Sequence, residues 1–197
     1  TFVERAREAL ADEERANMVL LRGFAARPDL PTFAEAYGLE ACAVAAYPMY
    51  RGLASLLGMT LVPPPEHLEA AVEAIATRWD AHDFFFLHHK ATDSTGEDGD
   101  FDAKVAQIER LDSAVPALRD LAPDVLVVTG DHSTPAHLSM HSWHPVPVVL
   151  HAATARRDTT DRFGERTCVA GGLGRRPATD LMALALAHAR RLSKYGA

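Results

Sequence analysis

Short apolar runs alternate along the chain with longer segments in which apolar residues recur every three to four positions. A short apolar run is typical of a buried strand, and the three-to-four-residue period is typical of an amphipathic helix. We expect strands at 18–21, 41–46, 60–62, 83–88, 124–129 and 146–151. We expect helices at 2–16, 33–37, 50–57, 66–79, 101–119 and 180–194. This alternation predicts an α/β fold with a mostly parallel sheet and helices on both faces.

Several helix ends carry recognisable signals. Thr32 can cap the helix at 33–37, and Gly38 can stop it. The prolines at 63–65 are expected to open the helix at 66–79. In the helix at 101–119, the residues expected to face inward are Val105, Ile108, Leu111 and Val115.

Polar residues gather directly after two of the expected strands. The first cluster spans 88–100, the second spans 129–135, and a third spans 141–147 just before the next strand. In open parallel sheets, ligand sites form beyond the carboxyl ends of the strands. The clusters combine Asp and His, which together suit Zn²⁺, Mn²⁺ or Co²⁺. Two such ions roughly 3.5–4 Å apart could clamp the oxygens of a transferring phosphoryl group.

Each cluster also has an interpretation without a metal. Asp131 could cap a helix beginning near Ser133, and His141 and His144 could be loop residues packed on Trp143. The acidic, Gly-rich run at 93–100 could be a solvated turn. It lacks the ligand spacing of an EF-hand.

Composition narrows the possible partners. The chain has 197 residues, of which 48% are hydrophobic and 24% charged, as in ordinary globular proteins. Its net charge of −7 does not suggest a partner such as nucleic acid or a membrane surface. No apolar run is long enough to span a bilayer. Cys42 and Cys168 form no CxxC motif and no disulfide framework, so we expect a cytoplasmic location.

Three segments, KATDSTGEDGDFDAKVAQIERLD, VTGDHSTP and HSWHPVPVVL, resemble signature segments of archaeal-type, 2,3-bisphosphoglycerate-independent phosphoglycerate mutases, members of the alkaline phosphatase superfamily. The resemblance continues in NMVLLRG, AAYPMYRGLASLLGM and the ending KYGA. It implies an alkaline-phosphatase-like fold that is incomplete here, because the N-terminal part of the parent protein has no counterpart. Within one domain we expect a substrate-side segment at 1–62 and a metal-binding core portion at 63–197.

The resemblance implies two divalent metal ions. The first would be held by Asp93, His141 and Glu97. At position 97 the family usually has His instead of Glu. The second would be held by Asp131 and His132, together with an Asp and a nucleophilic Ser from the N-terminal part. Mn²⁺ is the expected ion, with Mg²⁺, Co²⁺ and Zn²⁺ as alternatives. Alternatively, Glu97 is a surface acid.

Basic residues are expected to grip the substrate. The candidates are Arg22, Arg51 and Lys90, since guanidinium and ammonium groups bind carboxylate and phosphate. The family more often has Lys at the position of Arg51. Lys90 could instead orient a ligand or form an ion pair with Asp98 or Asp100. As a surface acid, Glu97 would point to solvent or pair with Lys90 or Lys104.

The activity implied by the resemblance is the interconversion of 3-phosphoglycerate and 2-phosphoglycerate through a phosphoserine. We expect no catalytic nucleophile in this chain, because Ser94 and Ser133 are not at the family's nucleophile position. The chain alone is therefore expected to be inactive. The alternatives are another metal-dependent phosphohydrolase or phosphotransferase of the superfamily, or a non-catalytic metal-binding fragment. The sequence gives no indication of oligomeric state.

Overall fold

A computed structural model describes residues 1–192, which fall into two compact units, one spanning residues 1–31 and the other beginning at Thr32. The expected boundary at 62/63 concerns roles within one domain and stays a prediction. The KYGA ending and the last part of the helix expected at 180–194 lie outside the described residues. Among the described residues, no helix is both long and apolar enough to cross a membrane.

The first unit contains a single short helix, α1 (Phe2–Ala9). Thr1 and Glu4 form a capping box at its start. The helix expected at 2–16 ends early because α1 buries none of its residues, and a short helix without packing is marginal in water. Residues 18–21 do not form the expected strand. An apolar run makes a strand only beside another strand, and the described residues of this unit include none.

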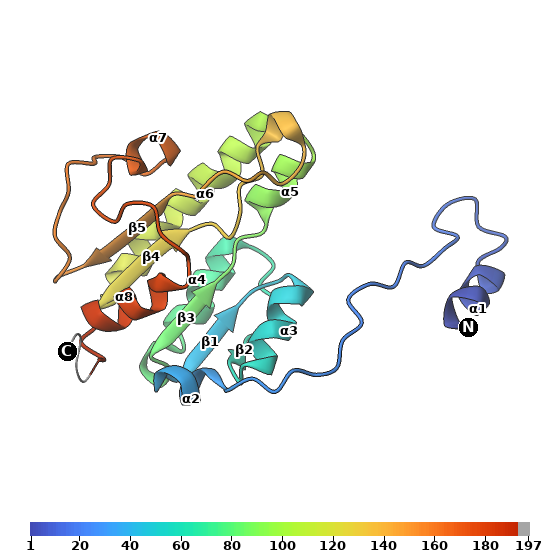
Figure 1. Ribbon diagram of the computed structural model, residues 1–197, viewed down its shortest axis with the longest axis horizontal. Coiled ribbons are helices and arrows are strands. Elements are labelled where there is room, and N and C mark those ends of the chain that lie inside the picture. Colours follow the sequence, from blue (N-terminus) through green and yellow to red (C-terminus); the bar gives the residue numbers. More distant parts are fainter. Residues whose placement is uncertain (193–197) are drawn as a thin grey trace. The chain divides into compact units, whose positions relative to one another are not determined.

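The second unit contains two groups of strands (Figure 1). In the first, β1 (Ala41–Val44) lies between β2 (Thr60–Leu61) and β3 (Phe84–Leu87), and both pairings are parallel. In the second, β4 (Val125–Thr129) pairs with β5 (Val148–Ala152) in antiparallel fashion. The α/β class and the parallel pairing are confirmed, whereas β5 departs from the parallel arrangement.

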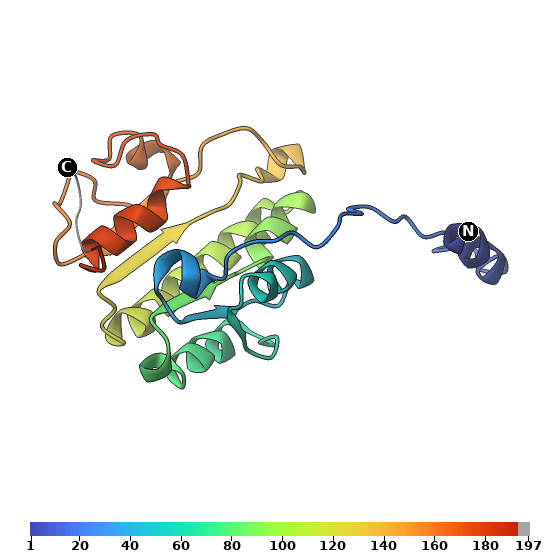
Figure 2. The same cartoon turned by 60° about the horizontal axis from the view of Figure 1, so that its bottom comes forward.

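Helices cover both faces of the first sheet (Figures 1 and 2). On one face, Ala41, Ala43, Phe84 and Phe86 pack against α2 (Phe33–Tyr37), α3 (Pro48–Leu56) and α8 (Asp180–His188). The alternate residues Cys42, Val44, Phe85 and Leu87 pack against α4 (Leu68–Ala76) and α6 (Phe101–Asp120). This alternation follows from the two-residue period of a strand and explains why both of its faces are apolar.

The capping signals predicted the start of one helix correctly and that of another incorrectly. Helix α2 has the expected bounds, with Thr32 as its cap and Gly38 in the left-handed region at φ 66°. Helix α4 begins two residues later than predicted. Its cap is His67, whose Nδ1 accepts a hydrogen bond from the backbone N–H of Ala70 at 3.1 Å, and not the preceding prolines.

The predicted inner face of α6 is partly wrong. Val105 and Ile108 are exposed, and α6 reaches the core through Leu118. Near its start it presents Lys104 inward, which donates to the carbonyl oxygen of Thr92 at 2.7 Å. The reason is that α6 packs along a second helix, α5 (Ala91–Glu97), whose surface is polar.

Helix α5 lies where the sequence pattern predicted no helix and where a solvated turn was one alternative. Its residues Ala91–Glu97 include Thr, Ser and Gly, which have weak helix propensity, so its packing on α6 must stabilise it. Three further short elements were not predicted: α7 (Glu165–Cys168) and the 3₁₀ turns η1 (Trp79–Ala81) and η2 (Ala136–Leu138).

Candidate metal centre

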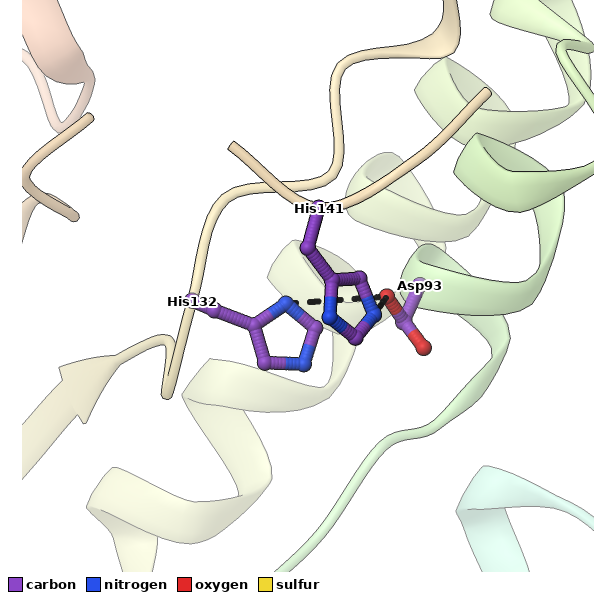
Figure 3. A group of neighbouring side chains, drawn as sticks. All are labelled: Asp93, His132 and His141. Carbon is purple, nitrogen blue, oxygen red and sulfur yellow. Dashed lines mark ion pairs between the residues drawn. The ribbon is translucent and has the colours of Figure 1, made fainter. Parts of the chain in front are cut away.

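Three side chains from separate segments of the second unit point toward one another (Figure 3). Asp93 lies on α5, His132 follows β4, and His141 follows η2. An isolated bridge between Ser133 and Ser142 holds the last two segments together, and the Ser142 N–H donates to the Ser133 carbonyl oxygen at 2.9 Å. This bridge is what brings His141 back beside His132.

The donor atoms of this group are close enough to share a cation. Asp93, His132 and His141 each offer one ligand atom, and these atoms lie within 4.8 Å of one another. Oδ1 of Asp93 is 3.6 Å from Nε2 of His141 and 3.8 Å from Nδ1 of His132. The two imidazole rings are 3.8 Å apart between centroids. These distances suit side chains arranged around an ion rather than bonded to each other.

Asp93 is the most enclosed member of the group, with 15% of its side chain exposed. Burial would raise the pKa of Asp93, but hydrogen bonds from Lys90 and Thr134 outweigh it, so the pKa lies below its usual value. The same bond from Lys90 raises the pKa of Lys90. Asp93 is therefore an ionised carboxylate at neutral pH.

Glu97 extends the group by one carboxylate. Asp93 and Glu97 are four residues apart on α5, so both lie on one face of the helix. Oε1 of Glu97 is 3.5 Å from Nε2 of His141, and Oε2 is 3.8 Å from Nζ of Lys90. The structure thus places Glu97 against His141 and Lys90, although its side chain is still 48% exposed.

Asp131 lies on the other side of His132. Its Oδ2 is 3.5 Å from Nε2 of His132 and accepts a hydrogen bond from the hydroxyl of Tyr50. Its Oδ1 accepts from the backbone N–H of His132 at 3.1 Å. Burial would raise the pKa of Asp131, but the Tyr50 bond and the neighbouring His132 lower it overall. Asp131 does not cap a helix, because the residues after it form no helix before Ala136.

The expected substrate-binding residues occupy different settings. Lys90 is engaged with Asp93 and Glu97 and lies 5.2 Å from the ring centroid of Tyr47. No ion pair joins Lys90 to Asp98 or Asp100 in the part of the chain that the structure describes, so that alternative is wrong.

Arg51 uses Nη1 to bind two backbone carbonyl oxygens, those of Ala45 at 3.0 Å and Val62 at 2.7 Å. This nitrogen ties the ends of β1 and β2 together. Arg22 belongs to the first compact unit. For both arginines, a role in substrate binding stays a prediction.

Three residues of this site were not among the candidates singled out from the sequence. Thr134 donates to Asp93 and Tyr50 donates to Asp131, and the ring of His88 packs against that of Tyr50 in a tilted arrangement, 4.1 Å between centroids. Nδ1 of His88 is buried without a hydrogen-bond partner among the described residues, and burial lowers the pKa of His88. Thr134 lies within the VTGDHSTP segment, so only its place beside Asp131 and His132 could have drawn attention to it.

The donor set fits a divalent cation. Imidazole nitrogens and carboxylate oxygens are the usual protein ligands of Zn²⁺ and Mn²⁺. Asp93, Glu97 and Asp131 place three carboxyl groups around two imidazoles, and Lys90 is the cation that pairs with this group. A bound cation would offset this concentration of negative charge. Ser133 adds no free hydroxyl, because it donates to the carbonyl oxygen of His144 at 3.4 Å.

The fold and this site define a metalloenzyme, and the chain belongs to the Metalloenzyme superfamily, whose family model matches residues 8–188. It is 51% identical over its whole length to a protein of Deinococcus radiodurans and 47% identical to one of Aquifex aeolicus. Both are named probable 2,3-bisphosphoglycerate-independent phosphoglycerate mutases. These relatives confirm the resemblance found in the three motifs.

Two solved structures are similar to the chain. The PH0037 protein of Pyrococcus horikoshii is 32% identical with a TM-score of 0.84, over 89% of this chain and 57% of that one. The cofactor-independent phosphoglycerate mutase of Thermoplasma acidophilum is 25% identical with a TM-score of 0.69, over 94% of this chain and 49% of that one. The chain spans about half the length of the relatives it matches, 49% and 48% of the two bacterial proteins.

Proposed function

We propose that the protein to which this chain belongs interconverts 3-phosphoglycerate and 2-phosphoglycerate through a phosphoserine intermediate. The observation that carries the proposal is the group formed by Asp93, His132 and His141, found in a chain whose relatives are named phosphoglycerate mutases. The serine and one further Asp would come from the remainder of the protein, as the motif resemblance implies. The chain described here would supply most of the metal ligands.

Two sets of residues would hold the ions. Asp93, Glu97 and His141 form one set, with their donor atoms on one side of the site. Asp131 and His132 form the other. When bound, divalent ions neutralise charge on phosphoryl oxygens and favour the deprotonated form of a coordinated hydroxyl.

The other side chains orient the ligands and complete the charge balance. Lys90 holds one oxygen of Asp93, and Thr134 holds the other. Tyr50 holds Oδ2 of Asp131. Lys90 also presents a positive charge beside the group, where it could attract the phosphate of a small anionic substrate.

Several finer points belong to the same proposal. Two Mn²⁺ ions are the cofactors we expect, since three carboxylates favour an oxygen-preferring cation. The substrate is a small phosphorylated acid rather than nucleic acid or a membrane, and the protein acts in the cytoplasm in glycolysis. Arg22 and Arg51 are the proposed contacts to the substrate carboxylate or phosphate.

An assay coupled to enolase tests the proposal on the full-length protein with Mn²⁺ and 3-phosphoglycerate. We expect turnover that falls by at least about 10²-fold in Asp93→Ala and Asp131→Ala, the range expected when ligands of a catalytic charge site are lost. Asp112→Ala, an exposed acid on α6, is the matched control and should leave turnover unchanged.

Generic phosphate esters form the second arm of this assay. Hydrolysis of such esters without mutase turnover would overturn the proposal in favour of a different phosphohydrolase. Absence of both activities in a protein that binds metal would favour a non-catalytic role.

A further inference from the structure

Thr134 connects Asp93 with His132 and is the most enclosed polar residue of the site, with 4% of its surface exposed. It follows His132 by two residues and is 41 residues from Asp93 in the sequence. A buried hydroxyl must satisfy its hydrogen-bonding capacity internally, so its partners reveal its role. The role inferred for Thr134 rests on the proposed function only in assuming that the site binds a metal ion. The hydrogen bonds of Thr134 do not depend on that assumption.

The hydroxyl of Thr134 has two partners. Oγ1 donates to Oδ1 of Asp93 at 2.5 Å, and Oγ1 lies 3.1 Å from Nδ1 of His132. A hydrogen bond from a hydroxyl to an ionised carboxylate is charge-assisted. The three groups thus form a hydrogen-bonded series from Asp93 through Thr134 to His132.

The number of hydrogens available to these three groups determines which group donates in each hydrogen bond. An ionised carboxylate only accepts, whereas a threonine hydroxyl has a single hydrogen to donate. That hydrogen is used on Asp93, so the oxygen of Thr134 must accept from His132. In the neutral imidazole, Nδ1 therefore carries the hydrogen and Nε2 carries the free lone pair.

The free lone pair on Nε2 faces Asp131. Nε2 of His132 is 3.5 Å from Oδ2 of Asp131, while the hydrogen-bearing Nδ1 faces Asp93. We infer that Thr134 is a positioning residue that fixes the tautomer of His132, directing Nε2 to a divalent cation shared with Asp131. Nδ1 of His132, the ring nitrogen that faces Asp93, is then not available as a metal ligand.

Close packing keeps Thr134 in place. Gly96 of α5 lies against it, and a Cβ at position 96 would approach the carbonyl oxygen of Thr134 to 2.4 Å and its Cγ2 to 3.0 Å. Such contacts leave the threonine side chain little room to rotate. The tautomer is therefore set by a rigid group before any ion arrives.

The tautomer can be measured by ¹⁵N NMR of the imidazole nitrogens of His132, on the metal-free 197-residue chain near pH 8.5, above the ordinary range of histidine. The inference predicts hydrogen on Nδ1 in the wild type and in Thr134→Ser, which keeps the hydroxyl. Thr134→Val, nearly the same shape without the hydroxyl, should shift the population toward hydrogen on Nε2. Hydrogen on Nε2 in the wild type would overturn the inference, whether or not the valine variant folds.

Metal titration gives a second readout. With Mn²⁺ as the probe, the affinity of the site that contains Asp131 should fall about 10- to 100-fold in Thr134→Val and be largely kept in Thr134→Ser, as for other groups that orient a metal ligand. Equal loss in both variants would contradict the role of the hydroxyl. Because the NMR measurement uses neither metal nor substrate, failure of the mutase assay leaves the inference standing, and the reverse also holds.

Discussion

At the scale of single residues, Tyr50 shows how the site depends on a contact between distant parts of the chain. Its ring packs against those of His88 and Phe86, and its hydroxyl donates to Asp131, 81 residues away. Burial, with the bond to Asp131, raises the pKa of Tyr50 to about 12. Tyr50 therefore remains a proton donor throughout the physiological range and holds the carboxylate of Asp131 in one orientation.

Replacing Tyr50 with Phe removes only this hydroxyl. We expect the free energy of unfolding to fall by about 1 kcal/mol, at the low end for a bond to a charged group because Asp131 is half exposed. Mn²⁺ affinity should fall by about tenfold, as when a group that orients a ligand is lost. Urea unfolding and metal titration measure both, with Tyr37→Phe on the exposed Tyr37 as the control. Unchanged metal affinity in Tyr50→Phe would contradict the orienting role.

The lowered pKa of Asp93 predicts how stability responds to acid. Because the folded pKa lies below the unfolded value of about 3.9, Asp93 stabilises the metal-free fold above that value. This contribution is lost as the pH falls through the folded pKa. Asp93→Asn should therefore flatten the decline of the unfolding free energy below about pH 5 in urea titrations. A decline as steep as that of the wild type would show that Asp93 is not stabilised as an anion.

The sequence allowed some residues of the site to be predicted and not others. Asp93, His132 and His141 stand out because each lies in a short motif next to a predicted strand end or strand start. Tyr50 and Thr134 do not, because their roles arise from bonds across 81 and 41 residues that no local pattern encodes. The same holds for Arg51, whose bonds to two backbone carbonyl oxygens appear only once β1 and β2 are paired.

At the scale of elements, α5 carries two of the candidate metal ligands, yet the sequence pattern did not predict it as a helix. A run with Thr, Ser and Gly predicts a loop, yet it folds as a helix because α6 packs along it. The four-residue spacing of Asp93 and Glu97 on this helix explains why their side chains point the same way. Its Gly96 lies too close to Thr134 for a larger residue.

Gly96→Ala tests this close approach. The added Cβ meets backbone at 2.4 Å, so α5 must shift, and we expect a loss of about 1–3 kcal/mol in unfolding free energy with weaker Mn²⁺ binding. Gly52→Ala is the matched control. Gly52 also lies inside a helix, but a Cβ there meets nothing within 4 Å, so this variant should be unchanged or more stable by up to about 1 kcal/mol. Similar thermal unfolding of the two variants would contradict the packing of α5 on Thr134.

At the scale of the whole molecule, the succession of strands and helices could be predicted because both faces of β1 and β3 are covered. Such strands read as continuous apolar runs, and FFFL at 84–87 is one of them. The antiparallel pairing of β5 could not be predicted, since an apolar run does not reveal the direction of its neighbour. Residues 18–21 show the same limit, because an apolar run with no neighbouring strand forms none.

Because the net charge is −7 and three carboxyl groups lie close together, we expect a bound cation to stabilise the fold. We expect Mn²⁺ at about 100 times its dissociation constant to stabilise the chain by about 2.7 kcal/mol, and EDTA to reverse this. Calorimetric melting with Mn²⁺, with EDTA and with Mn²⁺ on Asp93→Asn measures the effect. A melting temperature that does not respond to Mn²⁺ would show that the site is not formed in this chain.

The most direct test of the central claim, that these side chains form a divalent metal site, is anomalous diffraction at the manganese edge from crystals of the chain grown with Mn²⁺. We expect an anomalous peak bound by Asp93 and His141, with ligand distances near those of other N and O ligands, about 2.0–2.2 Å. Any second peak should lie beside Asp131 and Nε2 of His132. Crystals that take up Mn²⁺ elsewhere, with no peak between Asp93 and His141, would show that these side chains do not form a metal site.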